Sequence, residues 1–320
     1  MWLISLGVTG ALLALIFRRV ETGRVMESVR DARVLPLLGA LAVSFLTNCR
    51  LAAAKWRRIL IPLGLEIPVR EAFLIKMGSG PVKSVFPFRA GEASRVIYLK
   101  RRHKFSAARA TGSILLELLM NILVFLTLIL TGGLAWRNAP PGLAAVSGLL
   151  LAGTLAAIFG AGKAGRTGWF RPVLARIPGA RLRGGLETLL NFHRFFTPKE
   201  IAIPLFQSLV IQGGKLLSFF LIASAFRITL PPPVYLVILP FSILIAGIPV
   251  AFLGIGLREG SLVELVPLYT SLPAAAVLAP ALVFSAVEYL FPVLLGLGWT
   301  GQFTRRLLEG TRGEGKAAGV

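Results

Sequence analysis

The chain has 320 residues, of which 55% are hydrophobic and 15% charged, and its mean hydropathy is +0.77. Soluble domains typically carry about 25% charged residues, so this composition excludes an ordinary soluble protein and favours one integral membrane domain. The net charge of +21 would also suit nucleic-acid binding, but we expect no such partner, because the basic residues stand between apolar runs, where they orient spans and attract anionic lipids.

Two apolar runs open the chain, Met1–Phe17 and Val34–Ala54. The first is close to the minimum of about 17 residues that a transmembrane helix needs. Its positive charge, Arg18-Arg19, follows the apolar run, whereas in a cleaved signal peptide the charge precedes it. We therefore predict that both runs are transmembrane helices, and that Trp56, in the basic cluster after the second, lies at the membrane surface.

The next segment, Val69–Tyr98, mixes apolar residues with residues that a lipid-facing helix does not carry. These residues are Lys76, Gly78, Gly80, Pro81, Lys83, Pro87, Arg89, Gly91 and Glu92. Non-helical backbone at membrane depth is tolerated only where protein or water covers it. The pattern predicts a re-entrant hairpin or a broken helix, which the basic loop 100–104 closes.

Further spans follow in the rest of the chain. They are predicted at Thr111–Leu134, Leu143–Ala161, Pro204–Phe226 and Ala274–Trp299. A long basic loop, 163–199, separates the second of these from the third, and its part near 186–196 predicts an amphipathic interfacial helix. The segment Val234–Tyr269 repeats the earlier irregular pattern, since an apolar run leads into Gly254-Ile255-Gly256 and then Arg258-Glu259.

The fold class that these elements predict is an all-α polytopic membrane protein with six to eight transmembrane helices and two re-entrant or broken segments. If both irregular segments re-enter, six spans remain; Val234–Ile255 is long enough to cross, which would raise the number to seven or eight. The basic loops 100–104 and 163–199 should be cytoplasmic, as should the C-terminus. We expect a multi-pass protein of the cytoplasmic membrane, with one transmembrane domain over 1–303 and a flexible polar tail over 304–320.

A weak internal repeat relates the halves 34–161 and 204–299. Each half contains a span, an irregular segment with an adjacent arginine and glutamate, and a span that carries a glutamate. With the orientation above, the two irregular segments enter from opposite sides. That arrangement predicts an inverted repeat, in which the binding site lies where broken helices meet near the middle of the membrane.

Cysteine and histidine are too few for a metal site or a disulfide. Cys49 is the single cysteine, and the two histidines, His103 and His193, are far apart in basic stretches. Neither histidine accompanies a nucleophile, and Gly254-Ile255-Gly256 lacks the strand and helix of a nucleotide-binding loop. We therefore expect no metal, no cofactor and no catalytic residues.

The candidate substrate-binding residues are ionisable groups inside apolar segments, which usually mark a pathway or a site. They are Arg89, Glu92, Arg95, Glu117, Lys215, Arg258, Glu259 and Glu288. An arginine can bind phosphate oxygens with its planar fork of donors; the alternative is that the arginines only neutralise neighbouring glutamates. Glu117 and Glu288 could carry a coupling proton or hydrogen-bond a neighbouring helix. Lys215 could contact the substrate or extend toward the membrane surface.

Several motifs, taken in order, resemble one known family. They are Trp56-Arg57-Arg58, then Pro87-x-Arg89-x-Gly91-Glu92-x-x-Arg95, then the span with Glu117, then Gly254-x-Gly256-x-Arg258-Glu259. This order resembles the transmembrane-region family of lysylphosphatidylglycerol synthases, a flippase-like domain. Family members often have an asparagine-rich stretch where Gly78–Lys83 stands, and Pro-Gly-Gly where Phe252-Leu253-Gly254 stands.

The resemblance implies a polytopic domain that moves membrane lipids with phosphate headgroups between leaflets, without the soluble synthase domain. Aminoacylated phosphatidylglycerol, other phospholipids and polyprenyl or hopanoid-related lipids are the substrate classes that it suggests. We expect a transporter and not an enzyme. The alternatives are a non-catalytic membrane partner of a glycosyltransferase or lipid-modifying enzyme, and a membrane-embedded lipid-modifying enzyme. The protein partners that these three functions suggest are a second copy of the chain and a membrane glycosyltransferase.

Overall fold

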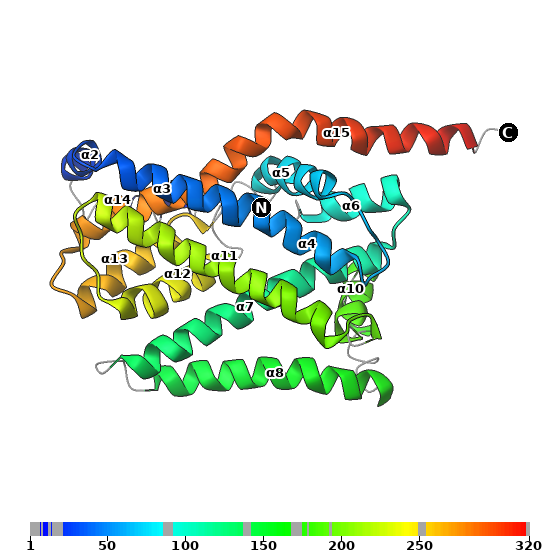
Figure 1. Ribbon diagram of the computed structural model, residues 1–320, viewed down its shortest axis with the longest axis horizontal. Helices are drawn as coiled ribbons and strands as arrows, with labels where there is room; N and C mark the ends of the chain where they lie inside the picture. Colours follow the sequence, from blue (N-terminus) through cyan, green and yellow to red (C-terminus); the bar gives the residue numbers. More distant parts are fainter. Residues whose placement is uncertain are drawn as a thin grey trace.

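The computed structural model describes most of the chain, and its regular structure is helical throughout (Figure 1). The described residues are 7, 9–11, 14, 22–85, 92–136, 142–167, 175–177, 179–191, 194–248 and 254–317, and they contain no strand. Four helical stretches among them are long and apolar enough to cross a membrane. They are Val34–Leu60, Ala107–Ala135, Pro198–Ala225 and Ala274–Leu308. The chain is therefore an all-α multi-pass membrane protein, as predicted.

Among the described residues, five helical stretches run along the long axis of the molecule (Figure 1). The first is α3 (Val34–Ser44), η1 (Phe45–Leu51) and α4 (Ala52–Leu60); then come α7 (Ala107–Ala135), α8 (Leu143–Thr167) and α11 (Pro198–Ala225); the last is α14 (Ala274–Ser285), η5 (Ala286–Leu290) and α15 (Phe291–Ala317). The first and last contain a π-helical segment, η1 and η5, near their middle. The sixth predicted span, Met1–Phe17, lies largely outside the described residues.

Both irregular segments re-enter, and neither crosses. The first forms α5 (Val69–Val85) and α6 (Glu92–His103), which pack on each other at the end where α4 finishes and α7 begins. The second forms η3 (Val234–Ile238), α12 (Leu239–Ala246) and α13 (Leu257–Tyr269) at the opposite end. Hairpins from opposite ends are what an inverted repeat requires, and the equivalence of the halves 34–161 and 204–299 stays a prediction.

Glycine permits the sharp return of the second hairpin. Gly254 has φ +71°, and a Cβ added there would lie 2.5 Å from the main-chain oxygen of Ala246 in α12. Gly256 has φ +91° and stands at the start of α13, where its N–H donates to Glu259 Oε2 at 2.6 Å. Any other residue type would be strained at these two positions. The Gly-x-Gly spacing is thus explained by the turn.

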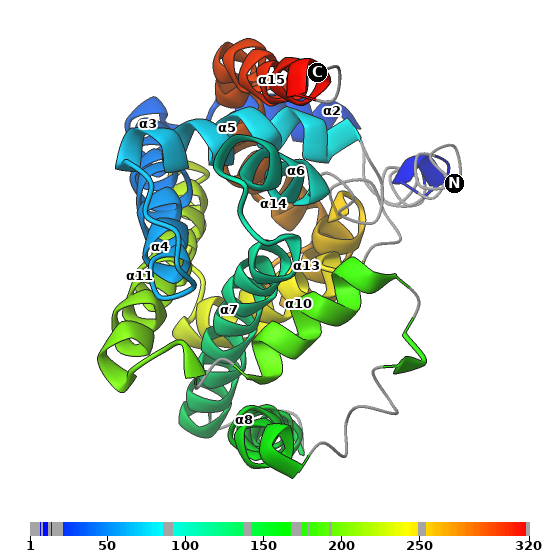
Figure 2. The same cartoon turned by 90° about the vertical axis from the view of Figure 1, so that its right-hand side faces the viewer.

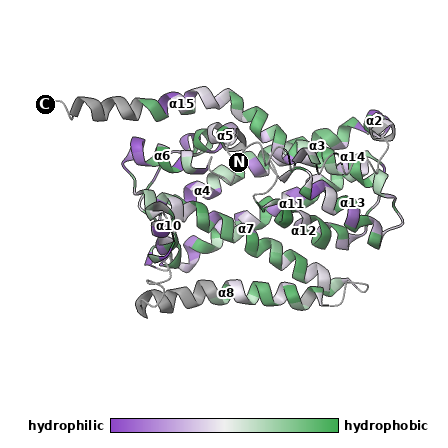
Figure 3. Ribbon diagram, turned by 180° about the vertical axis from the view of Figure 1, so that it is seen from behind, coloured by the Kyte–Doolittle hydropathy of each residue, from purple (hydrophilic) through white to green (hydrophobic). Residues whose placement is uncertain are grey.

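The basic segments gather at one end of the molecule. The end of α4, the last turn of α6, which contains the basic residues 100–103 that were expected in a loop, and α10 (Ala180–Leu190) lie together on the right of Figure 1. At the other end lie the C-terminal end of α7, which Trp136 caps, and α2 (Thr22–Arg30), which packs on α14. The arginines of α2 are therefore an exception to the charge asymmetry. Along the lengthwise helices hydrophobic residues predominate (Figure 3), and exposed side chains such as Leu149 and Phe206 face outward as lipid contacts would.

Two sequence-based boundaries need correction. The polar tail expected to be flexible from residue 304 continues α15 as far as Ala317, and Phe303, just before it, stacks on Tyr98 at 5.3 Å. The interfacial helix expected near 186–196 is α10, and it packs on α7 (Figure 2). At Gly185 an added Cβ would lie 2.5 Å from the Thr111 side chain. The apolar face of α10 is therefore covered by protein.

Two large apolar clusters, one toward each end, form most of the core in the described part of the chain. The first surrounds Trp56, Tyr98 and Phe303 near the basic end. The second surrounds Phe219 and Phe284 near the other end and includes residues of α11, α12, α13 and α14. Buried charged side chains adjoin both clusters, and these charges form the candidate site.

Candidate functional site

Glu117, on α7, is the centre of a buried group of charges. It is 7% exposed, and its carboxylate pairs with three cations. Lys76 Nζ lies 2.5 Å and Lys55 Nζ 3.8 Å from Oε1, and Arg95 Nη1 lies 3.4 Å from Oε2. The cations come from α5, α4 and α6 respectively. One carboxylate therefore ties the first hairpin to two lengthwise helices.

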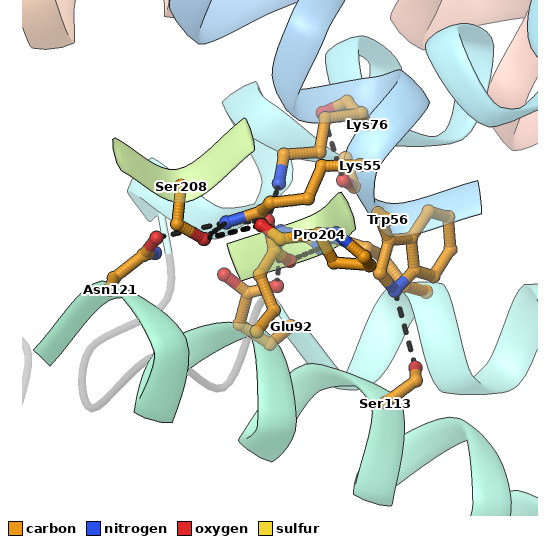
Figure 4. Close-up of polar contacts among 11 residues, drawn as sticks. Lys55, Trp56, Lys76, Glu92, Ser113, Asn121, Pro204 and Ser208 are labelled. Atoms are coloured by element: carbon orange, nitrogen blue, oxygen red, sulfur yellow. Dashed lines mark hydrogen bonds and ion pairs between the residues drawn. The ribbon is translucent and has the colours of Figure 1, made fainter. Parts of the chain in front are cut away.

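Arg95 makes a second ion pair within its own helix. Its Nη2 lies 2.5 Å from Glu92 Oε2, three residues earlier on α6. Its guanidinium carbon lies 5.4 Å from the ring centroid of Trp56, whose Nε1 donates to Ser113 Oγ at 3.2 Å (Figure 4). Arg95 Nε is buried and has no hydrogen-bond partner among the described residues. The guanidinium is thus held in place with one donor unused.

Lys55 extends the group to α11. The side chain is 1% exposed, and its Nζ donates to Asn121 Oδ1 at 2.9 Å and to Ser208 Oγ at 3.2 Å (Figure 4). Ser208 in turn donates to the main-chain oxygen of Pro204 on α11. Five helices (α4, α5, α6, α7 and α11) therefore contribute side chains to one polar centre.

The charges of this centre do not cancel. We call Lys55, Lys76, Glu92, Arg95 and Glu117 the five-charge cluster; it holds three cations and two carboxylates, a net charge of +1. Charges removed from water are costly unless they are paired. The unused donor of Arg95 and the net charge both favour an anion, and a phosphate offers oxygens that charge-assisted donors bind strongly.

A second group of charges lies on the α13 side. Arg258 and Glu259 are both 0% exposed, and Arg258 Nη2 lies 3.2 Å from Glu259 Oε1. Arg258 Nε donates to Ser285 Oγ at 2.9 Å, and Ser285 also hydrogen-bonds Glu259. Glu259 Oε2 caps α13 by accepting the Gly256 N–H. Glu259 is therefore fully engaged in structural contacts, while Arg258 Nη1 is buried and has no partner in the part of the chain that the structure describes.

Lys215 and Glu288 complete the second group. Glu288, on η5, is 4% exposed and accepts a hydrogen bond from Asn48 Nδ2 on η1. Lys215, on α11, is half-buried, with its Nζ 5.8 Å from the Phe125 ring centroid and 6.0 Å from that of Tyr289. The Arg258 guanidinium packs on the same Tyr289 ring at 3.8 Å. Tyr289 is thus a shared neighbour of Lys215 and Arg258.

The family described as the lysylphosphatidylglycerol synthase TM region matches residues 2–296. The chain belongs to this family. A comparison with curated proteins found no match. Membership confirms the resemblance that the motifs indicated, and it associates the chain with membrane-lipid function.

Within this lysylphosphatidylglycerol synthase membrane region, the predicted site residues divide between two places. Glu92, Arg95 and Glu117 belong to the five-charge cluster; Lys215, Arg258, Glu259 and Glu288 belong to the second group. Arg89 lies outside the described residues. That these residues bind substrate stays a prediction. No group of three or more metal-binding side chains occurs in the described part of the chain.

Sequence reasoning missed Lys55, Lys76 and Asn48 as site residues. Lys55 was assigned to an interfacial basic cluster, whereas it is buried. Helical spacing carried a usable signal: Lys55 follows Asn48 by seven residues, which is two turns, and Asn121 follows Glu117 by four. Residues at these spacings lie on one helix face. Two polar faces on two long apolar helices predict that the faces meet.

Proposed function

We propose that this protein transports a phosphate-bearing, anionic lipid between the leaflets of the cytoplasmic membrane. The observation that supports this best is the five-charge cluster, with its net charge of +1 and the unused Arg95 Nε donor. A lipid phosphate would neutralise the cluster and accept hydrogen bonds from it. The acyl chains would remain in the surrounding lipid, because the outer faces of the lengthwise helices expose large apolar side chains.

Binding and movement are linked through Glu117. Three cations converge on its carboxylate, two of them from the α5–α6 hairpin and one from α4. A phosphate that enters competes with Glu117 for these cations. When the phosphate takes Arg95 and Lys76, the hairpin loses its strongest electrostatic contacts with α7. Lipid binding in this scheme favours a hairpin position different from that of the empty protein.

The two hairpins enter from opposite ends of the molecule, which would allow a lipid to reach the site from either side of the membrane. The α5–α6 hairpin enters from the basic end, which we assign to the cytoplasm on its charge, together with the C-terminal part of α15. The α12–α13 hairpin enters from the other end. Broken helices that meet near the middle of the membrane are how many transporters open a site alternately to each side. The hairpins are the elements that we expect to move.

The test is lipid transfer in reconstituted vesicles. Fluorescent phosphatidylglycerol in one leaflet is followed with a membrane-impermeant quencher, for the wild type and for Arg95→Gln. A charge-assisted hydrogen bond contributes about 1.5–3 kcal/mol, so Arg95→Gln should slow transfer at least about tenfold. Arg102→Gln, on the same helix with a side chain 43% exposed, is the matched control and should transfer normally.

The outcomes distinguish the competing functions. A folded Arg95→Gln protein with normal transfer overturns the assignment of the five-charge cluster as the lipid site. If wild-type protein transfers no lipid until a glycosyltransferase or lipid-modifying enzyme is added, the chain is a partner subunit. If it changes the lipid covalently, it is an enzyme. Mass spectrometry of the vesicle lipids after the assay separates these cases.

A further inference from the structure

Two of the three π-helical segments in the described part of the chain, η1 and η5, meet at a buried carboxyl group. Asn48 lies on η1 and Glu288 on η5, and the Asn48 side-chain amide donates to Glu288 Oε2. Next to this contact Ser44 Oγ donates to the main-chain oxygen of Val287 at 3.1 Å. π-helical turns inside long helices are rare and frequently occur at functional sites. Here η1 and η5, which are more than 200 residues apart in the sequence, are joined by the hydrogen bond between Asn48 and Glu288.

Glu288 has too few partners for a buried carboxylate. Its Oε1 is buried and accepts no hydrogen bond, and the carboxylate forms no ion pair among the described residues. The contrast with Glu117 is direct, since that carboxylate has three cations within 4 Å. A lone carboxylate in apolar surroundings is strongly disfavoured, whereas the protonated acid is neutral.

The hydroxyl groups beside Glu288 point to the same conclusion. Ser44 and Ser218 both face the carboxyl group. Each already donates its own proton elsewhere, Ser44 to Val287 and Ser218 to the main-chain oxygen of Ala40 at 3.1 Å. Their oxygens therefore present lone pairs. With their protons committed to the main chain, these oxygens can accept from a protonated Glu288, whereas the same hydroxyls turned toward Glu288 would stabilise its carboxylate.

The other charged and titratable groups around Glu288 are few. From α11 only Lys215 faces it. From η1 the thiol of Cys49 faces it, and Lys76 of α5 acts on that thiol from the other side. Neither α3 nor α14 contains a titratable residue, and α15 carries no charge before Arg305. Lys215 is therefore the cation that would compensate Glu288 if the acid lost its proton.

We propose that Glu288 is a proton-binding site, and that the proton taken up on its Oε1 from one side of the membrane leaves to the other side as lipid is moved. Loss of the proton draws Lys215 from the Phe125 and Tyr289 rings toward the carboxylate. Tyr289 also covers Arg258 on α13. The charge of Glu288 thus acts on the second hairpin. This coupling role rests on the proposed lipid transport, whereas the proton site itself does not.

Infrared difference spectroscopy tests the proton site directly. The purified wild-type protein is taken through an acid-to-alkaline series, and the carbonyl band of protonated carboxylic acids is followed. One component of the band should titrate in the wild type and be missing from Glu288→Gln, which keeps an acceptor for Asn48, while the other carboxylic acids contribute to both spectra. Glu187→Gln, an exposed acid on α10, is the matched control and should retain the band. If Glu288→Gln does not fold, Glu288→Asp should instead shift the band.

Lipid transfer tests the coupling. Transfer into vesicles with a pH difference should change by up to about tenfold per pH unit, the limit for one proton. In Glu288→Gln it should not respond to pH. Unchanged infrared spectra in Glu288→Gln overturn the proton site even where lipid transfer is normal. An intact titrating band in a protein that moves no lipid overturns the transport function and leaves the proton site standing.

Discussion

Replacement of Glu117 by glutamine is the most informative single change at the five-charge cluster. The substitution preserves the size of the side chain and removes its charge. Of the five-charge cluster only one carboxylate then remains, Glu92, which pairs with Arg95, and the net charge of the cluster rises from +1 to +2. The three cations come from three helices that Glu117 holds together. The change should therefore loosen the contact between the first hairpin and α7.

The expected loss of stability is large. Removal of one partner from a buried ion pair typically costs about 3–5 kcal/mol, because the remaining charge is left without compensation. Glu117 is 7% exposed, so solvent compensates little. A second substitution, Lys76→Met, removes one of the stranded charges and returns the net charge to +1. The double variant should recover about 0.5–3 kcal/mol, the usual coupling between residues in direct contact.

Unfolding in detergent by heat or denaturant measures these differences. Glu187→Gln, with the same chemical change at an exposed position of α10, should stay within about 0.5 kcal/mol of the wild type. If Glu117→Gln is equally close to the wild type, or if Lys76→Met adds further loss instead of recovery, then Glu117 does not bind the cations together and the reasoning above is wrong.

Three further predictions concern the second hairpin and the topology. Gly254→Ala should lower stability in the same unfolding assay by about 1–3 kcal/mol, because its φ is +71°; Gly213→Ala, which meets no atom within 4 Å, should not. Arg258→Ala should be strongly destabilising, and a second change, Glu259→Ala, should restore stability only in part, because it also removes the α13 cap; full recovery in the double variant would contradict the capping role. A cysteine placed in segment 100–104, the end of α6 and the residue after it, of an otherwise cysteine-free protein should resist an impermeant thiol reagent applied from outside, and its labelling would reverse the assigned orientation.

The fold class and the family were predictable from the sequence because membrane physics constrains them. Apolar runs of sufficient length must be helices, and prolines, glycines and charges inside Val69–Tyr98 cannot face lipid. These constraints act locally, so the spans and the irregular segments can be recognised without the tertiary structure. Whether Val234–Ile255 crosses depends on the path of the chain after it. That question was settled only when α13 was seen to return to the end from which the hairpin entered.

The partners of the charges were decided by tertiary packing alone. Nothing in the sequence distinguishes Glu117 from Glu288, since both are single glutamates inside apolar spans. The structure gives Glu117 three cations and leaves Glu288 with an amide and an unpartnered oxygen. Lys55 stands in a basic cluster for which the sequence predicts a position at the membrane surface. It is buried because α7 and α11 pack over it. Hydropathy and spacing determine which segments enter the membrane, whereas the meeting of side chains from distant helices determines which charges are paired.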